Sequence, residues 1–212
     1  MIQPATDPRS YATHPPLALG GALCLDFINT TAWRGDPARS AERLHDYAEL
    51  VHWATGLELI DTRSAALLLD EAEAKVRAAE QVHGLALRLR GEIEQALDPA
   101  HAGLARLVEA EALLRDIERV GQLVDTGAAR IHHWHPSGSP PDLRLPLLPV
   151  AVSVLELVAS RRRYHLRRCA DPSCGWVFLD ETRNQSRQWC SMEGCGNRAK
   201  ARAHYARRKA RG

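Results

Sequence analysis

Apolar residues recur at helical spacing over most of the first 160 residues of the chain. The pattern runs from Leu44 to Ala54, from Asp61 to about Leu97, and from about His101 to Val124. The stretch from Val150 to Ala159 is nearly all apolar, which predicts a helix buried on every side at the centre of a domain. These periods predict a mainly helical body.

Capping residues and glycines indicate where two of these helices begin, end or divide. Asp36 followed by Pro37 suits the N-cap and the first position of a helix, and Gly56 suits its C-cap. The first helix is therefore expected to begin at this Asp-Pro pair. Gly84 or Gly91 is expected to divide the long stretch that follows.

Two segments have the features of strands. Residues 17–30 hold two adjacent glycines between apolar pieces, which predicts a hairpin or a strand entering the core. Residues 127–136 alternate along a predicted strand, with residues 143–145 as its partner. This strand carries a histidine cluster, His132, His133 and His135. A half-exposed hairpin strand is favoured over a metal site, because no cysteine or carboxylate lies nearby in the sequence.

The composition is that of a soluble globular protein, with 212 residues, 45% hydrophobic and 25% charged. Residues 1–16 lack any period and predict a flexible arm. No apolar run is long enough to span a membrane, and we expect a cytoplasmic protein. The net charge of +2 is unevenly placed: residues 161–212 hold 14 Lys and Arg against 4 Asp and Glu, whereas residues 1–160 hold 14 against 22. A basic tail on an acidic body indicates a polyanion partner, or docking of the tail on its own body.

Four of the five cysteines lie in the basic tail as two pairs, Cys169 with Cys174 and Cys190 with Cys195. Each pair encloses four residues, and fifteen residues separate the pairs. Two close cysteine pairs supply the four soft ligands that a tetrahedral Zn²⁺ requires, so we predict one structural zinc ion. Free or disulfide-bonded thiols are the alternative. The remaining cysteine, Cys24, is expected to be a small buried thiol.

The residues around the cysteines predict a treble-clef arrangement. Residues 170–173 form a turn, residues 175–179 have the composition of a strand, and residues 188–190 are its expected return strand. A second turn at residues 191–194 precedes a helix from about Cys195 towards Arg211. The zinc would then be held by a knuckle, a hairpin and the first turn of that helix.

The terminal helix has two kinds of surface. Ala199, Ala203, Ala206 and Ala210 share one side, which we expect to pack on the zinc hairpin. The basic residues surround this seam and are the candidate nucleic-acid contacts: Arg198, Lys200, Arg202, Arg207, Arg208 and Lys209. A solvated helix without a partner is the alternative.

Two motifs resemble a known bacterial family. Trp189-Cys190-Ser191-Met192 and Cys195-Gly196-Asn197-Arg198 are similar to the CGNR zinc finger, and Leu25-Asp26-Phe27-Ile28-Asn29-Thr30 resembles the opening Leu-Asp-Phe-x-Asn-Thr signature of the ABATE domain. The resemblance implies stress-induced transcription regulators. It also implies three parts: a flexible arm, 1–16; an ABATE-like helical domain, 17–160; and a CGNR-type zinc finger with a basic C-terminal helix, 161–212. The expected fold class is mainly α (α+β).

Two functional hypotheses follow. In the first, the zinc finger and its basic helix bind DNA, while the helical domain senses a small-molecule effector or forms a homodimer. In the second, the zinc finger is a protein- or RNA-interaction module without sequence-specific DNA binding. No catalytic motif is present, so we expect neither an enzyme nor catalytic residues. Asp26 and Asn29 are expected to bond backbone groups or, with Trp33, to edge a ligand pocket.

Overall fold

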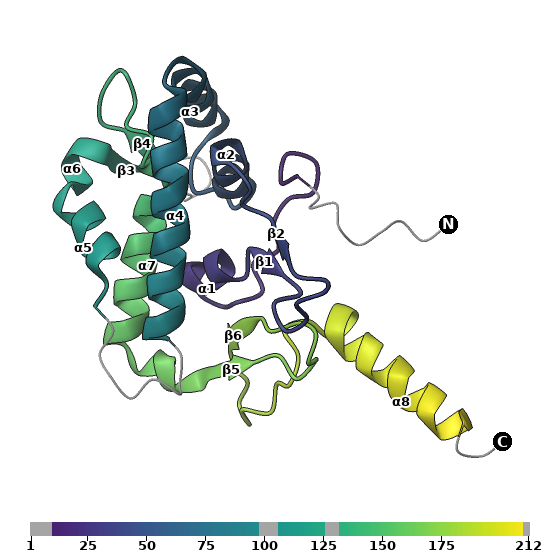
Figure 1. The fold of residues 1–212 in the computed structure, drawn as a ribbon. Coiled ribbons are helices and arrows are strands. Elements are labelled where there is room, and N and C mark those ends of the chain that lie inside the picture. Colours follow the sequence, from purple (N-terminus) through teal and green to yellow (C-terminus); the bar gives the residue numbers. More distant parts are fainter. Residues whose placement is uncertain (1–9, 98–105, 126–131, 210–212) are drawn as a thin grey trace.

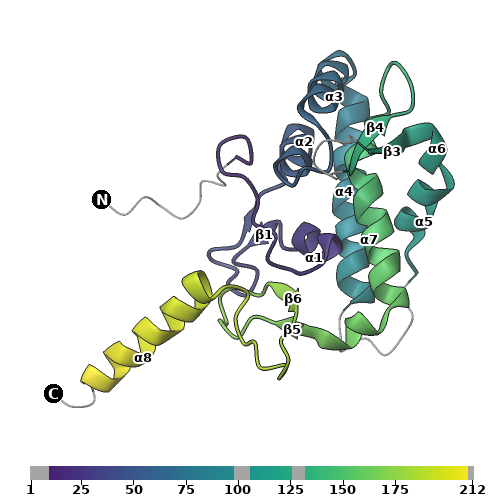
Figure 2. The same ribbon diagram turned by 180° about the vertical axis from the view of Figure 1, so that it is seen from behind.

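The computed structural model describes residues 10–97, 106–125 and 132–209. A helical body forms most of the molecule, and a smaller C-terminal part packs beneath it (Figure 1). The last helix, α8 (Asn197–Lys209), extends away from both parts, as the view from behind also shows (Figure 2). Within these residues, no helix combines the length and apolar character needed to cross a membrane.

Seven helices of the described chain form the body. They are α1 (Leu23–Ile28), α2 (Tyr47–Gly56), α3 (Thr62–Ala74), α4 (Val76–Ala96), α5 (Val108–Arg115), α6 (Ile117–Val120) and α7 (Leu148–Ala159). Single 3₁₀ turns precede and follow α7, at Leu145–Leu147 and Arg161–His165. The short helix α1 packs against both α4 and α7, and α5 packs against the same two helices. The body is therefore built around α1, α4 and α7.

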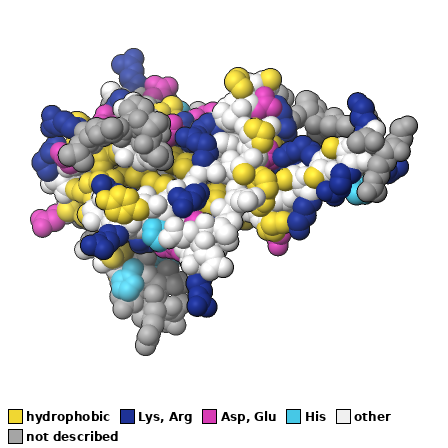
Figure 3. Space-filling view, turned by 90° about the horizontal axis from the view of Figure 1, so that it is seen from below, with side chains coloured by type: hydrophobic (Ala, Val, Ile, Leu, Met, Phe, Trp, Pro, Cys, Tyr) yellow, Lys and Arg dark blue, Asp and Glu magenta, His cyan; other side chains and the backbone are white. Residues whose placement is uncertain are grey.

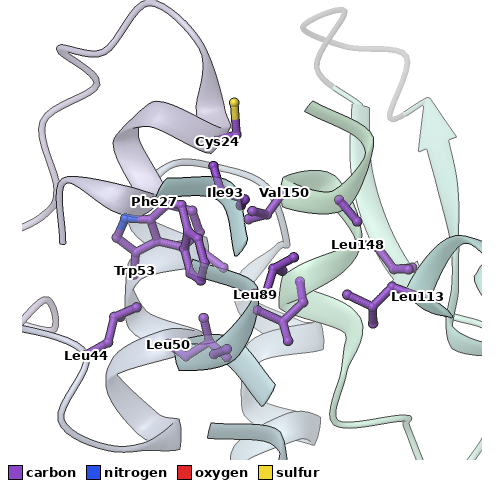
Figure 4. Close-up of a cluster of buried hydrophobic side chains, with 14 of the residues drawn as sticks. Cys24, Phe27, Leu44, Leu50, Trp53, Leu89, Ile93, Leu113, Leu148 and Val150 are labelled. Atoms are coloured by element: carbon purple, nitrogen blue, oxygen red, sulfur yellow. The ribbon is translucent and has the colours of Figure 1, made fainter. Parts of the chain in front are cut away.

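One apolar core joins these helices (Figure 4). Phe27 of α1 and Trp53 of α2 are both fully buried, with ring centroids 5.3 Å apart. The nearly all-apolar helix α7 contributes Val150 and Val154 to this core. Burial on every side was predicted for α7, but Glu156 on its outer side is exposed, so α7 has one open side.

Three two-stranded antiparallel sheets occur in the described residues. β1 (Thr31–Ala32) pairs with β2 (Ala41–Glu42), β3 (Gly121–Asp125) with β4 (His132–Pro136), and β5 (Leu166–Arg168) with β6 (Val177–Leu179). The first two belong to the body, and the third belongs to the C-terminal part. The mainly α class with small hairpins is confirmed.

The predicted hairpin or strand in residues 17–30 is wrong, because α1 occupies Leu23–Ile28. Cys24, Leu25, Phe27 and Ile28 are all buried, so α1 presents apolar residues on nearly every side. A helix of six residues buried all round has no polar face, and its sequence cannot be told from that of a buried strand.

The predicted start of the first long helix is also wrong. Asp36 lies in the loop between β1 and β2, where its side chain accepts a hydrogen bond from the Ala38 N–H at 3.2 Å. The actual N-cap is Asp46, whose carboxylate accepts the Glu49 N–H at 2.8 Å. Both aspartates suit a cap, and only the pairing of β1 with β2 removes Asp36 from the helix.

The long second stretch divides at a residue that the sequence did not indicate. Asp61 caps α3 by accepting the Ser64 N–H at 2.7 Å. The break follows at Lys75, which has φ −128° and ψ 58°, whereas Gly84 and Gly91 lie inside α4. The non-helical backbone of Lys75 therefore divides the stretch.

The hairpin around the histidines has a different partner from the predicted one. Residues 121–124 were predicted as the end of a helix, yet they belong to β3, which pairs with β4. Residues 143–145, the predicted partner, lead into a 3₁₀ turn instead. The parts of these predictions that fall on residues 98–105 and 126–131 lie outside the described residues.

Candidate zinc site and basic helix

The four cysteines of the tail come together in one buried cluster. Their sulfur atoms all lie within 4.8 Å of one another. The Cys174 and Cys190 Sγ atoms are 3.6 Å apart, and those of Cys190 and Cys195 are 3.5 Å apart. Both distances are too long for a disulfide bond. A tetrahedral zinc ion with 2.3 Å zinc–sulfur bonds requires sulfur atoms about 3.8 Å apart, so the cluster fits one zinc ion.

The thiols of this cluster differ in acidity when no metal is bound. A hydrogen bond from Cys190 lowers the pKa of Cys174 to about 6, and the same contact raises the pKa of Cys190. Burial raises the pKa of Cys195 to about 12. Zinc binds thiolates, so it must displace the protons that these groups retain. Four thiolate ligands leave no open position for water, and the ion is therefore structural.

Two strands and two turns place the ligands. Cys169 follows β5, and its N–H donates to the Trp176 carbonyl at 2.8 Å. In the turn that follows, the Cys174 N–H donates to the Asp171 carbonyl at 2.9 Å. The second pair is closed by Ser191, whose hydroxyl oxygen accepts the Gly194 N–H at 3.2 Å. A π-helical turn at Met192–Gly196 then carries Cys195 into α8.

The predicted return strand at residues 188–190 is wrong. Residues 166–168 pair with β6 over its whole length, whereas Gln188 accepts one backbone hydrogen bond, from the Ala170 N–H at 2.8 Å. The buried carboxylate of Asp180 organises the loop between β6 and these residues. It accepts hydrogen bonds from the Thr182 N–H at 3.0 Å and the Arg187 N–H at 2.9 Å.

A buried carboxylate holds the start of α8 against the zinc site. Asp171 has no exposed side-chain surface and pairs with Arg198 at 3.2 Å and Arg202 at 3.4 Å. Burial alone would raise the pKa of Asp171, but the Ser173 N–H and the two guanidiniums outweigh it and lower the pKa. Arg198 also donates to the Cys195 sulfur at 2.8 Å. Two of the six candidate nucleic-acid contacts are thus engaged within the protein.

The rest of α8 is exposed. The predicted packing of the alanine seam on the hairpin is wrong: α8 has no buried residue among Asn197–Lys209, and Ala203 and Ala206 face solvent. Ala210 lies outside the described residues. Lys200, Arg207, Arg208 and Lys209 are exposed, and none of them has a partner in the part of the chain that the structure describes.

The three candidate pocket residues lie where the body meets the C-terminal part. Asp26 accepts the N–H groups of Leu19 at 2.9 Å and Gly20 at 2.7 Å. Asn29 donates to the Val177 carbonyl at 2.8 Å and accepts the Val177 N–H at 3.0 Å, so it completes the free edge of β6. Both side chains therefore bond backbone groups. Trp33, by contrast, lines a pocket beside the zinc ligands.

The body and the C-terminal part share a closely packed boundary. Val177 and Leu179 of β6 belong to the core of the body. Gly35 and Gly175 lie in close contact across the boundary: a Cβ atom at Gly35 would overlap the Pro172 carbonyl, and one at Gly175 would lie 2.8 Å from the Gly35 nitrogen. Gly175 also has φ +69°, which glycine adopts without strain. The two parts are therefore closely packed against each other.

Sequence reasoning missed two residues that organise the site. Asp171 was interpreted only as a turn residue of the first knuckle. Arg187 was not singled out, yet it donates to the carbonyls of Leu19 at 3.0 Å and Trp189 at 3.0 Å, and it stacks on Phe178 at 4.2 Å. No local pattern identifies either role, because each depends on partners distant in the sequence.

The histidine cluster does not complete a metal site among the described residues, where the cysteines are the one group with suitable geometry. His133 Nδ1 and His135 Nε2 are buried without a hydrogen-bond partner. His135 Nε2 lies 3.7 Å from an Asp61 carboxylate oxygen. His135 thus lies against the N-terminus of α3, whereas His132 on the same strand is exposed.

Two family models match the chain. Residues 21–161 match the ABATE model, whose description is "Putative stress-induced transcription regulator", and residues 165–208 match the CGNR zinc finger. A comparison of the chain with curated proteins found no match.

Proposed function

Because the chain belongs to the ABATE family and carries a CGNR zinc finger, we propose that it is a transcription regulator that binds duplex DNA through α8. The observation that carries this proposal is the charge and exposure of this helix. It has six basic and no acidic residues, it extends away from the rest of the molecule, and every side chain from residue 201 to 209 is exposed. Such a helix has the diameter and charge to enter a major groove.

The basic residues of α8 would have two roles, contact with DNA and orientation of the helix. Lys200, Arg207, Arg208 and Lys209 are free to contact phosphates or base edges. Arg198 and Arg202 would instead fix the direction of α8 through Asp171. Four to six neutralised phosphates predict that log K falls with log salt with a slope of roughly −4 to −5.

The test is equilibrium binding of the zinc-loaded chain to a generic duplex over a salt series. Arg207→Ala/Arg208→Ala should weaken binding about tenfold or more at low salt and make the slope shallower by about 2. Arg63→Ala/Arg77→Ala removes the same charge from exposed positions on the body and should leave the DNA affinity and the salt slope unchanged. Equal losses in the two double variants would show that only net charge matters and would refute a DNA-binding role for α8.

The uncovered seam of α8 supports a second candidate, a protein- or RNA-interaction module. Ala203, Ala206 and the largely exposed ring of Tyr205 offer apolar contact that phosphate binding does not require. Weak, salt-insensitive binding to duplex DNA would favour this candidate. In either case, we propose that the helical domain has a sensing or homodimer-forming role, and that the chain works as the arm, body and zinc finger outlined from its sequence.

A further inference from the structure

A pocket of about 450 Å³ lies at the boundary between the body and the zinc finger. Leu19 and Trp33 line it from the body, and Trp176, Cys195 and Arg198 line it from the zinc finger. Its volume lies within the range of small-molecule sites, about 300–1,000 Å³. The zinc ligands form one of its walls, so its shape depends on a folded zinc site.

Trp33 is held in this pocket at a conformational cost. Its φ of +53° lies in the left-handed region, which is rare for a bulky residue. The indole is stacked with two guanidiniums, those of Arg39 at 3.6 Å and Arg198 at 4.7 Å from the ring centroid. Backbone strain of this kind is concentrated at ligand sites, where the surrounding structure maintains it.

The second indole is fixed by its only polar atom. Trp176 Nε1 donates to the Thr31 carbonyl at 2.9 Å. The indole therefore has no unsatisfied polar atom, and its faces offer apolar contact alone. Leu17 stands at the rim with 70% of its surface exposed. Two fixed indoles and the apolar side chains of Leu17 and Leu19 form a surface suited to stacking and apolar contact.

The cation of the pocket lining is already paired within the protein. Arg198, the cation of the lining, pairs with Asp171 and donates to Cys195. Glu193, the other charged lining residue outside the cysteines, is exposed to solvent. An anionic ligand would find no unpaired cation here, and a cationic ligand would find only the solvent-screened carboxylate of Glu193, whereas an uncharged planar ring would lose little by leaving water.

The face of the molecule seen from below carries both hydrophobic and basic side chains (Figure 3). Hydrophobic side chains are gathered in part of that face, and Lys and Arg side chains stand around and beyond them towards α8 (Figure 3). The pocket lining includes none of the four free basic residues of α8, so a ring-shaped apolar ligand and a polyanion would bind at separate places.

We propose that the pocket binds a small, uncharged, planar aromatic molecule, and that Arg198 transmits its presence to α8. Arg198 alone among the lining residues contacts the strained indole, a zinc ligand and the carboxylate that anchors α8. A ligand that stacks on Trp33 changes the position of this guanidinium and hence the hold of Asp171 on α8. This second step rests on the proposed DNA binding, whereas the pocket itself does not.

The first experiment measures binding without DNA. The zinc-loaded full chain is titrated calorimetrically with indole, indoleacetate and tryptamine, which share a ring and differ in charge. Indole should bind at one site, at least as tightly as the two charged analogues. Trp33→Gly suits the positive φ and should weaken indole binding tenfold or more with one zinc retained. Leu17→Ser, at the exposed rim, should weaken it about threefold, and Tyr164→Ala, an exposed ring outside the pocket, should not change it.

Three results would each overturn the proposed ligand site: no binding of indole, unchanged indole binding in Trp33→Gly and Leu17→Ser, or a tenfold preference for a charged analogue. The second experiment repeats the DNA titration with saturating indole, which should change DNA affinity about fivefold or more in the wild type and not in Trp33→Gly. Indole binding with unchanged DNA affinity would refute the role of Arg198. A chain that binds indole and no DNA would refute the proposed function and leave the pocket standing.

Discussion

Individual polar residues decide how the two parts of the molecule meet. Asn29 satisfies both backbone groups of Val177, and Asp26 satisfies two N–H groups of the segment that leads into α1. Their positions in the Leu-Asp-Phe-x-Asn-Thr signature could be read from the sequence. Their hydrogen-bond partners could not, because those of Asn29 lie 148 residues away.

Asp26 should make stability depend on pH in an unusual direction. Burial raises its pKa to about 6, although the Gly20 and Leu19 N–H groups counteract it. The folded state therefore holds the proton more tightly than the unfolded chain, and this contribution to stability is present below about pH 4 and lost as the pH rises through about 6. Asp26→Asn retains an acceptor oxygen for both N–H groups. It should be more stable than the wild type by up to about 3 kcal/mol at pH 7, with the difference shrinking as the pH falls towards 5.

Chemical denaturation at a series of pH values, with zinc in excess, measures this difference. Asp70→Asn, at an exposed position on α3, is the matched control and should show no such trend. Parallel pH profiles for wild type and Asp26→Asn would contradict the raised pKa.

At the scale of elements, end signals were read correctly only where no tertiary contact competed with them. The helical stretch predicted from Asp61 begins there, with Asp61 as the N-cap of α3, whereas Asp36 was displaced from its predicted role by the pairing of β1 and β2. The direction of α8 follows the same rule. Its alanine seam predicted packing, but the ion pairs of Asp171 point the helix away from the hairpin.

Asp171→Asn should therefore loosen α8. The amide still accepts the Ser173 N–H, but it cannot pair with the two guanidiniums, which should cost about 1.5–3 kcal/mol because the group is buried. Amide hydrogen exchange in residues 197–209 should become faster while the body is unaffected.

The matched control is Glu181→Gln, which breaks the exposed pair with Arg162 and should cost less than about 1 kcal/mol. Unchanged exchange in α8 of Asp171→Asn would show that the helix is held by the zinc turn alone.

At the scale of the whole molecule, the two parts share one apolar core. β6 contributes Val177 and Leu179 to the core of the body, and Arg187 ties the loop after β6 to Leu19. The zinc finger is therefore a support for the body as well as a platform for α8.

Removing zinc should consequently destabilise the helical body. A chelator should lower the midpoint of the helical melting transition by at least about 5 °C. When the zinc finger unfolds, the body loses Val177 and Leu179 from its core and the hydrogen bonds between Asn29 and the backbone of β6. Circular dichroism at a helical wavelength measures this. Cys190→Ser already lacks one ligand, so the chelator should add little. A body that melts at the same temperature with and without zinc would show two independent units.

The sequence by itself determined the zinc ligands, the basic character of α8 and the mainly helical class. Each of these depends on residue type and local spacing: four soft ligands in two pairs, a run of Lys and Arg, and apolar residues at period 3.6. Only the tertiary structure decided that α1 is a helix, that β6 pairs with β5 and is completed by Asn29, and that Asp171 directs α8 outward. These features depend on which distant groups satisfy a buried carboxylate, an amide or an open strand edge, and local spacing carries no information about those partners.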